Sequence, residues 1–318
     1  MTKRRGLLIF VIVYMLGLLV YLGILAGRES TPASADISTS YNGIQILPDV
    51  QKDAIPTLNQ PAFLPANSQL TWLSDDDLVL MTSINGQAKA YPIKLLNWHG
   101  IVNDSIGERA VVVTYNPLTN YAAMFSSEVN GTVYEFRNTG ALYESSLVMF
   151  DTETDTYYSQ ILQKGIRGEN IEAELQLIPS AVISVAEFRQ QFSNGEIMSI
   201  DTGYARNYLD DPYLLYRDID SDAPFPVSNY DTRLPNKTVV LGLENNGQAR
   251  AYNISEFAGL TVRDTLGGQT VEILVSPQGD FAQAFIVNGD NRVPAPAVTS
   301  YWFAWALTHP DTGIASAN

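Results

Sequence analysis

The longest apolar run of the chain lies at its N-terminus. Residues 7–26 carry no charge, and the basic residues Lys3–Arg5 precede them. A helix of this length rises about 30 Å, which matches the hydrocarbon core of a bilayer, and basic residues on its N-terminal side favour the cytoplasm for that end. The pattern predicts a cytoplasmic tip over residues 1–6 and an uncleaved transmembrane signal anchor over residues 7–26. A cleaved signal peptide is the alternative, with a cleavage site at Ala33–Ala35.

Beyond residue 70 the apolar positions fall into short runs that turn residues separate. Two Asn-Gly pairs are each flanked by two such runs, Leu78–Ser83 with Gln87–Tyr91 and Thr238–Leu243 with Gln248–Tyr252. An Asn-Gly pair between apolar runs predicts a β-hairpin, because both residues tolerate positive φ. We also expect strands over Arg109–Tyr115, Thr270–Val275 and Ala282–Val287. Helices are expected over Pro92–Trp98 and over Tyr301–Thr308. A third helix is expected to begin at Ser184, which forms a capping box with Glu187. The predicted fold class is mainly β (α+β) with a few short helices.

Two stretches of the chain are similar to each other. Residues 78–125 can be laid over residues 239–285, with NGQAKAY at 85–91 matching NGQARAY at 246–252. The period is too long and the copies are too few for a solenoid. The sequence therefore predicts two related β-rich halves within an extracytoplasmic domain over residues 71–318. Five prolines among Ser, Thr, Asn and Ala predict an extended tether over residues 27–70.

Composition narrows the classes of partner and chemistry. The chain has 19 Lys and Arg residues against 34 Asp and Glu residues, and this acidic balance argues against a nucleic-acid partner or an anionic membrane surface. We expect membrane contact only through the N-terminal helix, while a ligand or protein partner stays unknown. Because the chain has no cysteine, it has no disulfide, thiolate nucleophile or Cys-ligated zinc.

Several blocks of the chain resemble one known family. The segment Ala90–His99 (AYPIKLLNWH), followed by Ile101–Asp104, is similar to the opening of domain of unknown function 3179 (DUF3179). Later blocks of that family resemble Val113–Leu118, Ser146–Asp151, Thr202–Tyr213 and Trp302–Thr312. The resemblance covers about residues 75–315 and implies no activity, because the family has none established.

The chain departs from that family at one motif. Members typically carry Cys-Pro-Leu-Cys-Gly where this chain has Asn116, Pro117, Leu118, Thr119 and Asn120. A Cys-x-x-Cys pair near a histidine holds a metal or exchanges disulfides. Asn and Thr do neither well, so the resemblance gives no support for thiol or thiolate-metal chemistry here.

His99 is the best single candidate for chemistry, because it occurs in only one of the two similar stretches. It is a possible general base or metal ligand, with Asp104 as its acidic partner. The alternative is a histidine that donates to a backbone carbonyl and fixes a loop. His309 comes at a predicted helix end, where a cation suits the helix dipole. No His-x-x-x-His spacing supports zinc, so no cofactor is predicted and an unknown divalent metal at His99 stays open.

The candidate ligand-binding residues are Trp98, His99, Asn116, Thr119, Gln160 and Arg206. Arg206 either binds an anionic ligand or pairs with Asp210 or Asp211 to hold a loop, and we favour the pairing. Without a recognised nucleophile motif, the sequence favours a membrane-anchored extracytoplasmic ligand-binding or structural module without assignable catalysis. A metal-assisted or hydrolytic enzyme centred on His99 is the alternative. Whether the chain is an enzyme stays undecided, with the balance against it.

Overall fold

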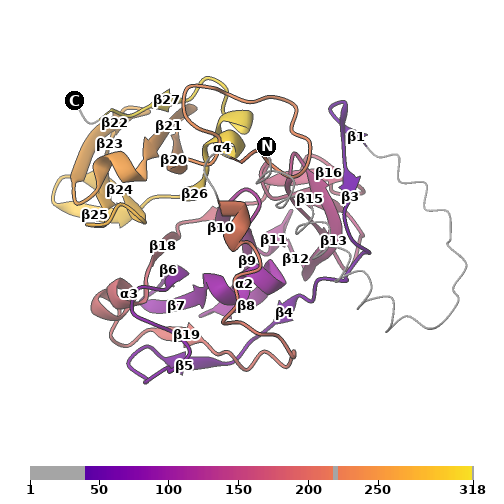
Figure 1. Cartoon of the computed structure of the whole chain (residues 1–318), viewed down its shortest axis with the longest axis horizontal. Coiled ribbons are helices and arrows are strands. Elements are labelled where there is room, and N and C mark those ends of the chain that lie inside the picture. Colours follow the sequence, from indigo (N-terminus) through magenta and orange to yellow (C-terminus); the bar gives the residue numbers. More distant parts are fainter. Residues whose placement is uncertain (1–39, 218–220, 317–318) are drawn as a thin grey trace, which may run out of the picture. The chain divides into compact units, whose positions relative to one another are not determined.

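The computed structural model describes residues 40–217 and 221–316, which fold mainly as β-strands (Figure 1). Its α-helices are α2 (Ile93–His99), α3 (Val185–Gln191) and α4 (Trp302–Thr308), so the predicted mainly β class with short helices is confirmed. The predicted cytoplasmic tip and transmembrane anchor lie outside the described residues. None of the helices within the described ranges is long and apolar enough to span a membrane.

The largest sheet brings together strands from both ends of the described chain. Its order is β27-β21-β20-β26-β10-β9-β8-β4, with β17 paired to β10. The strands are β4 (Leu58–Asn59), β8 (Ile101–Ile106), β9 (Arg109–Asn116), β10 (Tyr121–Ser126), β17 (Leu177–Ile178), β20 (Val239–Asn245), β21 (Gln248–Asn253), β26 (Ala297–Tyr301) and β27 (Gly313–Ile314). β26 pairs with β20 on one edge and with β10 on the other, and it thereby joins the two parts of this sheet.

Smaller sheets surround this one. One has the order β16-β15-β14-β13-β3, a second β18-β6-β7-β19-β5 and a third β22-β23-β24-β25, while β1 pairs with β2 and β11 with β12. Their strands are β1 (Ser40–Tyr41), β2 (Ile44–Gln45), β3 (Leu47–Pro48), β5 (Phe63–Pro65), β6 (Leu78–Ile84), β7 (Gln87–Pro92), β11 (Glu128–Val129), β12 (Thr132–Val133), β13 (Phe136–Tyr143), β14 (Ser146–Asp151), β15 (Tyr157–Ser159), β16 (Lys164–Arg167), β18 (Ala181–Ser184), β19 (Glu196–Met198), β22 (Thr261–Leu266), β23 (Gln269–Val275), β24 (Ala282–Asn288) and β25 (Asn291–Pro294). The described residues also contain two 3₁₀ helices, η1 (Leu214–Arg217) and η2 (Ile254–Phe257).

Both Asn-Gly hairpins are confirmed. Asn85 and Gly86 join β6 to β7 with φ of 51° and 80°, and Asn246 and Gly247 join β20 to β21 with φ of 48° and 74°. Two successive positive φ angles are the requirement of the two-residue turn whose twist matches that of the strands. The predicted N-cap is also present, since Ser184 accepts a hydrogen bond from the backbone N–H of Glu187 at the start of α3.

Packed structure begins closer to the N-terminus than the predicted tether implies. Residues 40–70 belong to the segment predicted as extended, yet they form β1 to β5, and Ile46, Leu58 and Ala66 are buried. β3, β4 and β5 pair with β13, β8 and β19. Proline and serine content reports local stiffness, whereas these short strands are held by partners distant in sequence, which a local pattern does not reveal.

A close contact fixes α4 against β20. A Cβ atom on Gly242 would lie 2.2 Å from Cε3 of Trp305, so the indole packs directly on the strand backbone. The indole N–H donates to the hydroxyl of Thr312 at 2.9 Å, and Trp305 is almost fully buried. Glycine is therefore required at this strand position for packing.

We expect Gly242→Ala to lower the free energy of unfolding by about 1–3 kcal/mol, because the added methyl group overpacks a buried ring. Urea unfolding of the full-length protein measures this change. Gly313→Ala is the matched control, because its added Cβ meets the flexible side chain of Arg250 at 3.2 Å. An equal loss in the two variants would contradict the assigned role of Gly242.

Candidate functional site

His99 ends α2 and is fully buried. Its Nδ1 lies 2.7 Å from the carbonyl oxygen of Pro56, to which it donates, and its Nε2 lies 2.7 Å from the hydroxyl of Tyr208. Burial lowers the pKa of His99 below its usual value of 6.5, so the ring is neutral at neutral pH. Both ring nitrogens are thus engaged within the protein, as in the loop-fixing alternative. A catalytic or metal-binding role of His99 stays a prediction.

Trp98 and Arg206 lie next to this histidine. The guanidinium of Arg206 lies 6.0 Å from the Trp98 ring, and Tyr204 places its ring 5.5 Å from that of His99. The expected pairing of Arg206 with Asp210 or Asp211 is wrong, since Asp211 pairs with Arg217 at 3.0 Å. Asp210 instead accepts from the Asn207 side chain at 2.6 Å. The sequence pattern does not show which of two nearby arginines folds back onto Asp211.

Asp104 is held away from His99 in a network of its own. Its carboxylate accepts from Lys89 at 2.8 Å and from the Tyr91 hydroxyl at 2.6 Å. Burial, with Asp104 beside it, raises the pKa of Tyr91 well above its usual value, so the hydroxyl stays a donor. The same contacts recur where Asp264 accepts from Arg250 at 3.0 Å and from Tyr252 at 2.9 Å. These ion pairs and tyrosine hydrogen bonds stabilise the hairpins and do not form a site with His99.

The turn over residues 116–119 replaces the Cys pair of the family with hydrogen-bonding side chains. Asn116 accepts from the backbone N–H of Leu118 at 3.0 Å and donates to the carbonyl of Ser145 at 3.1 Å. The carbonyl of Thr119 accepts from the backbone N–H of Tyr301 at 2.8 Å. The side chain of Asn116 therefore stabilises the turn, and β26 anchors its far end.

The tip of the β13–β14 hairpin lies against this turn in an uncommon backbone conformation. Glu144 and Ser145 have φ of 55° and 59°, which non-glycine residues rarely adopt, and both are buried. Glu144 accepts from the backbone N–H of Ser228 at 2.7 Å, and Ser145 donates to the carbonyl of Phe225 at 2.8 Å. Backbone strain of this kind persists only where surrounding contacts hold it.

The side chain of Gln160 lies next to the same hairpin. Its amide nitrogen donates to the hydroxyl of Thr114 at 2.9 Å and to the carbonyl of Tyr121 at 3.1 Å, and its oxygen accepts from Ser146 at 3.3 Å. Asn116, Thr119 and Gln160 therefore gather around one hairpin tip. Trp98, His99 and Arg206 lie next to one another, and the carbonyl of Gly100, which follows His99, accepts from the backbone N–H of Tyr115, which precedes Asn116, at 2.9 Å. Asp104 is bonded to Lys89 and Tyr91.

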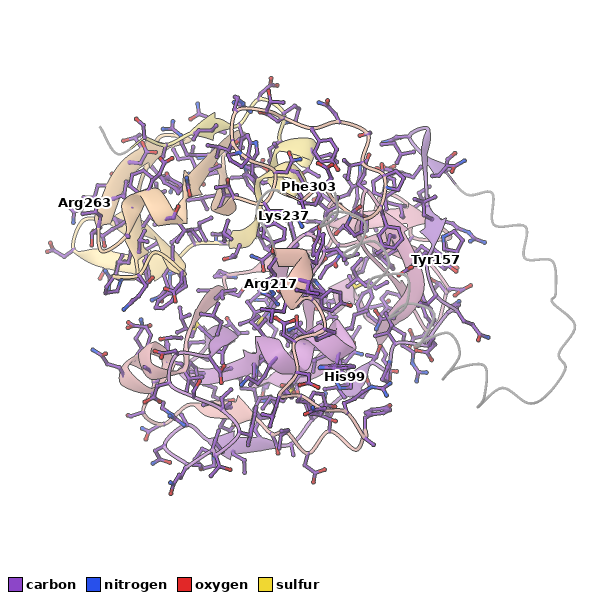
Figure 2. All side chains as sticks on the ribbon, viewed as in Figure 1. His99, Tyr157, Arg217, Lys237, Arg263 and Phe303 are labelled. Atoms are coloured by element: carbon purple, nitrogen blue, oxygen red, sulfur yellow. The ribbon has the colours of Figure 1, made fainter. Side chains whose placement is uncertain are left out.

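A largely irregular covering segment, residues 201–217 and 221–236, lies over both groups. Tyr208 reaches His99, and Tyr216 donates to the carbonyl of Leu118 at 2.7 Å. Arg217 sits within this segment, between His99 and Lys237 in the view of Figure 2. Its guanidinium pairs with Asp211 and donates to Asn97 at 3.4 Å. One positive group thus lies beside the turn, partly neutralised by a carboxylate.

Three buried oxygens around the turn have no hydrogen-bond partner within the described protein. They are Oγ1 of Thr119, Oγ of Ser300 and Oε1 of Glu144. Thr119 belongs to the turn, whereas Ser300 and Glu144 precede Tyr301 and Ser145, which are hydrogen-bonded to the turn. Buried polar groups are almost always paired, so these three oxygens are candidates for contact with a ligand or with water. Glu144 and Ser300 were missed in the sequence, because a Glu at a hairpin tip and a Ser in a strand follow ordinary patterns.

A preformed metal centre is not evident in the described ranges. No group of three or more His, Cys, Asp or Glu side chains within residues 40–217 and 221–316 is placed to hold a metal ion. The divalent metal considered for His99 therefore stays a prediction.

Comparison with known proteins identifies one relationship. A family model described as "Protein of unknown function (DUF3179)" matches residues 52–312. No curated protein and no solved structure gives a match. The matched region begins within the segment predicted as a tether, in agreement with the packing of residues 40–70 in the structure.

We expect Thr119→Val to raise the free energy of unfolding by about 1 kcal/mol, because it removes a buried hydroxyl that has no partner. Thr114→Val is the matched control. It removes a hydroxyl that donates to the carbonyl of Ala123 at 3.0 Å and accepts from Gln160, so we expect a loss of about 1–3 kcal/mol. Urea unfolding without added ligand compares the two. A destabilised Thr119→Val variant would show that its hydroxyl has a structural partner.

Proposed function

Because this chain belongs to the DUF3179 family, whose description names no activity, we propose its function from the site itself. The protein is a membrane-anchored extracytoplasmic binding protein. Its ligand is a small polar molecule, held at the turn over residues 116–119 beneath the covering segment. Ligand binding without thiol chemistry is consistent with Asn116 and Thr119 at the positions where the family carries cysteines.

The observation that carries this proposal is the set of three unpaired buried oxygens on Thr119, Ser300 and Glu144. Leaving such an oxygen without a partner destabilises a fold by about 1–3 kcal/mol. Proteins retain destabilising groups of this kind chiefly at sites that function requires. A ligand that donates and accepts hydrogen bonds at the turn recovers that free energy on binding. The hydroxyls act as donor or acceptor, and the Glu144 carboxylate oxygen accepts.

A metal-assisted or hydrolytic enzyme centred on His99 has less support. A general base needs access to the proton that it removes, whereas His99 is fully buried and both of its ring nitrogens have partners. Asp104, its expected acidic partner, is engaged by Lys89 and Tyr91. Binding at the turn therefore accounts better for the arrangement of polar groups.

We also propose that the domain contains two related halves. The elements β6-β7-α2-β8-β9-β10 in residues 78–126 follow the same order as β20-β21-η2-β22-β23-β24 in residues 239–288. The ion pairs Lys89–Asp104 and Arg250–Asp264 fall at equivalent positions of the two stretches, each with a tyrosine donating to the same carboxylate. Shared contacts of this kind support a common framework, and of the three unpaired groups only that of Thr119 lies within the first stretch.

The proposed location rests on the N-terminal sequence. Residues 7–26 form the anchor, residues 1–6 remain in the cytoplasm, and the domain lies outside. The charge of the domain is compatible with this placement, because an acidic surface is repelled by anionic lipid headgroups and the anchor alone supplies the attachment.

We expect the full-length chain, expressed in bacterial cells, to stay in the membrane pellet after alkaline extraction. Protease added to spheroplasts should degrade the domain and spare a tag at the N-terminus. Replacing Leu16 and Leu18 by Lys should release the chain, because each Lys near a helix centre opposes insertion by about 2.5–3.5 kcal/mol. A soluble product whose sequence begins near Asp36 would instead establish a cleaved signal peptide.

We expect a ligand of the proposed class to raise the melting temperature of the detergent-solubilised full-length protein. Thermal unfolding is followed with a panel of small neutral polyols, amides and amino acids, each at millimolar concentration. Thr119→Val should lose the response, because its hydroxyl contacts the ligand. Ser180→Ala is the matched control, since its buried hydroxyl is also unpaired but lies away from the turn, beside β18. Equal responses of the two variants, or none in the wild type, would overturn the proposal.

A further inference from the structure

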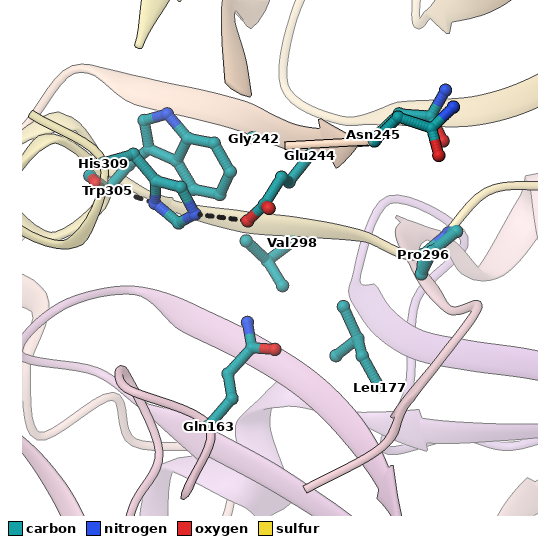
Figure 3. A pocket seen from close by; sticks show the side chains of 10 residues that line it. Gln163, Leu177, Gly242, Glu244, Asn245, Pro296, Val298, Trp305 and His309 are labelled. Atoms are coloured by element: carbon teal, nitrogen blue, oxygen red, sulfur yellow. Dashed lines mark hydrogen bonds and ion pairs between the residues drawn. The ribbon is translucent and has the colours of Figure 1, made fainter. Parts of the chain in front are cut away.

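A second region of the molecule contains a pocket of about 280 Å³. Glu244 and His309 lie on one side of it and Gln163 and Leu177 on the other (Figure 3). The volume is near the lower end of the range of about 300–1,000 Å³ that is usual for small-molecule sites. The pocket lies outside the turn over residues 116–119 and shares no lining residue with it.

The amide side chains that line this pocket have some or all of their N–H groups engaged outside it. Asn245 donates to the carbonyl of Leu266 at 2.8 Å and to Gln269 at 2.9 Å, and Asn246 donates to the carbonyl of Gly267 at 2.8 Å. Gln163 donates to the hydroxyl of Tyr121 at 2.9 Å. Asn245 therefore has only its oxygen left, as an acceptor, whereas Asn246 and Gln163 each keep an oxygen and one N–H.

Glu244 adds a carboxylate to these acceptors. Its Oε2 lies 3.3 Å from Nε2 of His309, which is its one polar partner within the described ranges. Burial lowers the pKa of His309 below 6.5, so the imidazole carries no charge at pH 7.5 and does not neutralise the carboxylate. No lysine or arginine lines the pocket. The pocket is thus rich in acceptors and negatively charged.

The aromatic ring in the lining is not a free stacking surface. Trp305 stacks on His309 with ring centroids 3.7 Å apart and planes 13° apart, and it packs on Gly242. The remaining apolar lining comes from Leu177, Val298 and Pro296. A ligand in the pocket therefore meets both oxygen acceptors and small aliphatic side chains.

We propose that this pocket binds a small organic ammonium ion with a short aliphatic part. An ammonium group donates three hydrogen bonds and accepts none, which complements the carboxylate and the amide oxygens. Its alkyl carbons contact Leu177, Val298 and Pro296. An anionic ligand meets only repulsion there, and a neutral alcohol lacks the charge that Glu244 attracts. The inference is independent of the turn, because no residue of the turn takes part.

The test uses the detergent-solubilised full-length protein at pH 7.5 and three probes of similar size. They are n-butylammonium, n-butanol and butyrate, and their binding is followed by ligand-observed saturation-transfer NMR. We expect millimolar binding of n-butylammonium, binding of n-butanol at least tenfold weaker, and no binding of butyrate. The proposal would be overturned if butyrate bound as tightly as n-butylammonium.

Two variants locate the binding in the pocket. Glu244→Gln should weaken n-butylammonium binding at least tenfold, and Gln163→Glu should strengthen it several-fold by adding a second carboxylate. Glu128→Gln makes the same change of charge at an exposed residue outside the lining and should have no effect. Glu244 is half-exposed, so its replacement is compatible with folding. Unchanged binding to Glu244→Gln would overturn the proposal, as would complete displacement of the amine by millimolar Ca²⁺, which would identify a metal-ion site.

Discussion

The pairing of β26 on both of its edges is the constraint on which the other features of the domain depend. All five residues of this strand are buried, so their backbone groups need partners within the protein. β20 supplies them on one edge and β10 on the other, although these two strands are far apart in the sequence. The N–H of Tyr301 then fixes Thr119, and α4 begins at the next residue. The turn thus meets one end of β26, and the pocket meets its middle at Val298.

Hydrogen-bond satisfaction separates the structural polar groups from the functional candidates. His99 and Asp104 are the residues that a search for chemistry selects first, yet both are buried and engaged within the protein. Both ring nitrogens of His99 have partners, and one carboxylate oxygen of Asp104 accepts from Lys89 and Tyr91. Groups engaged in this way contribute to the stability of the fold. Thr119 and Glu144 are the opposite case, because each is buried with an oxygen that no protein group contacts. Residue type alone does not make this distinction, since it depends on what the fold places nearby.

The strands and helices followed from local signals, whereas the sites did not. The Asn-Gly pairs, the Ser184 cap and the alternating runs each depend on residues next to one another, and all of these were correctly predicted. The packing of residues 40–70 depends on partners such as β13 and β19, to which no local pattern refers. The same holds for the pairing of Asp211 with Arg217 in place of Arg206. Asn116 and Thr119 stood out because they occupy the positions where the family carries cysteines, whereas Glu144 and Ser300 carried no signal.

The replacement of the family's cysteines bears on what this member retains. Asn116 holds the turn through its own side chain, and Thr119 holds it through its backbone carbonyl, so the local structure does not need sulfur. A structural role alone would favour a residue at position 119 without an unpaired hydroxyl, because valine fills the same space and leaves no polar atom buried. The retained hydroxyl is therefore consistent with the ligand contact that is proposed for the turn. In the proposed function, binding depends on the polar groups around the turn and not on the framework that carries them.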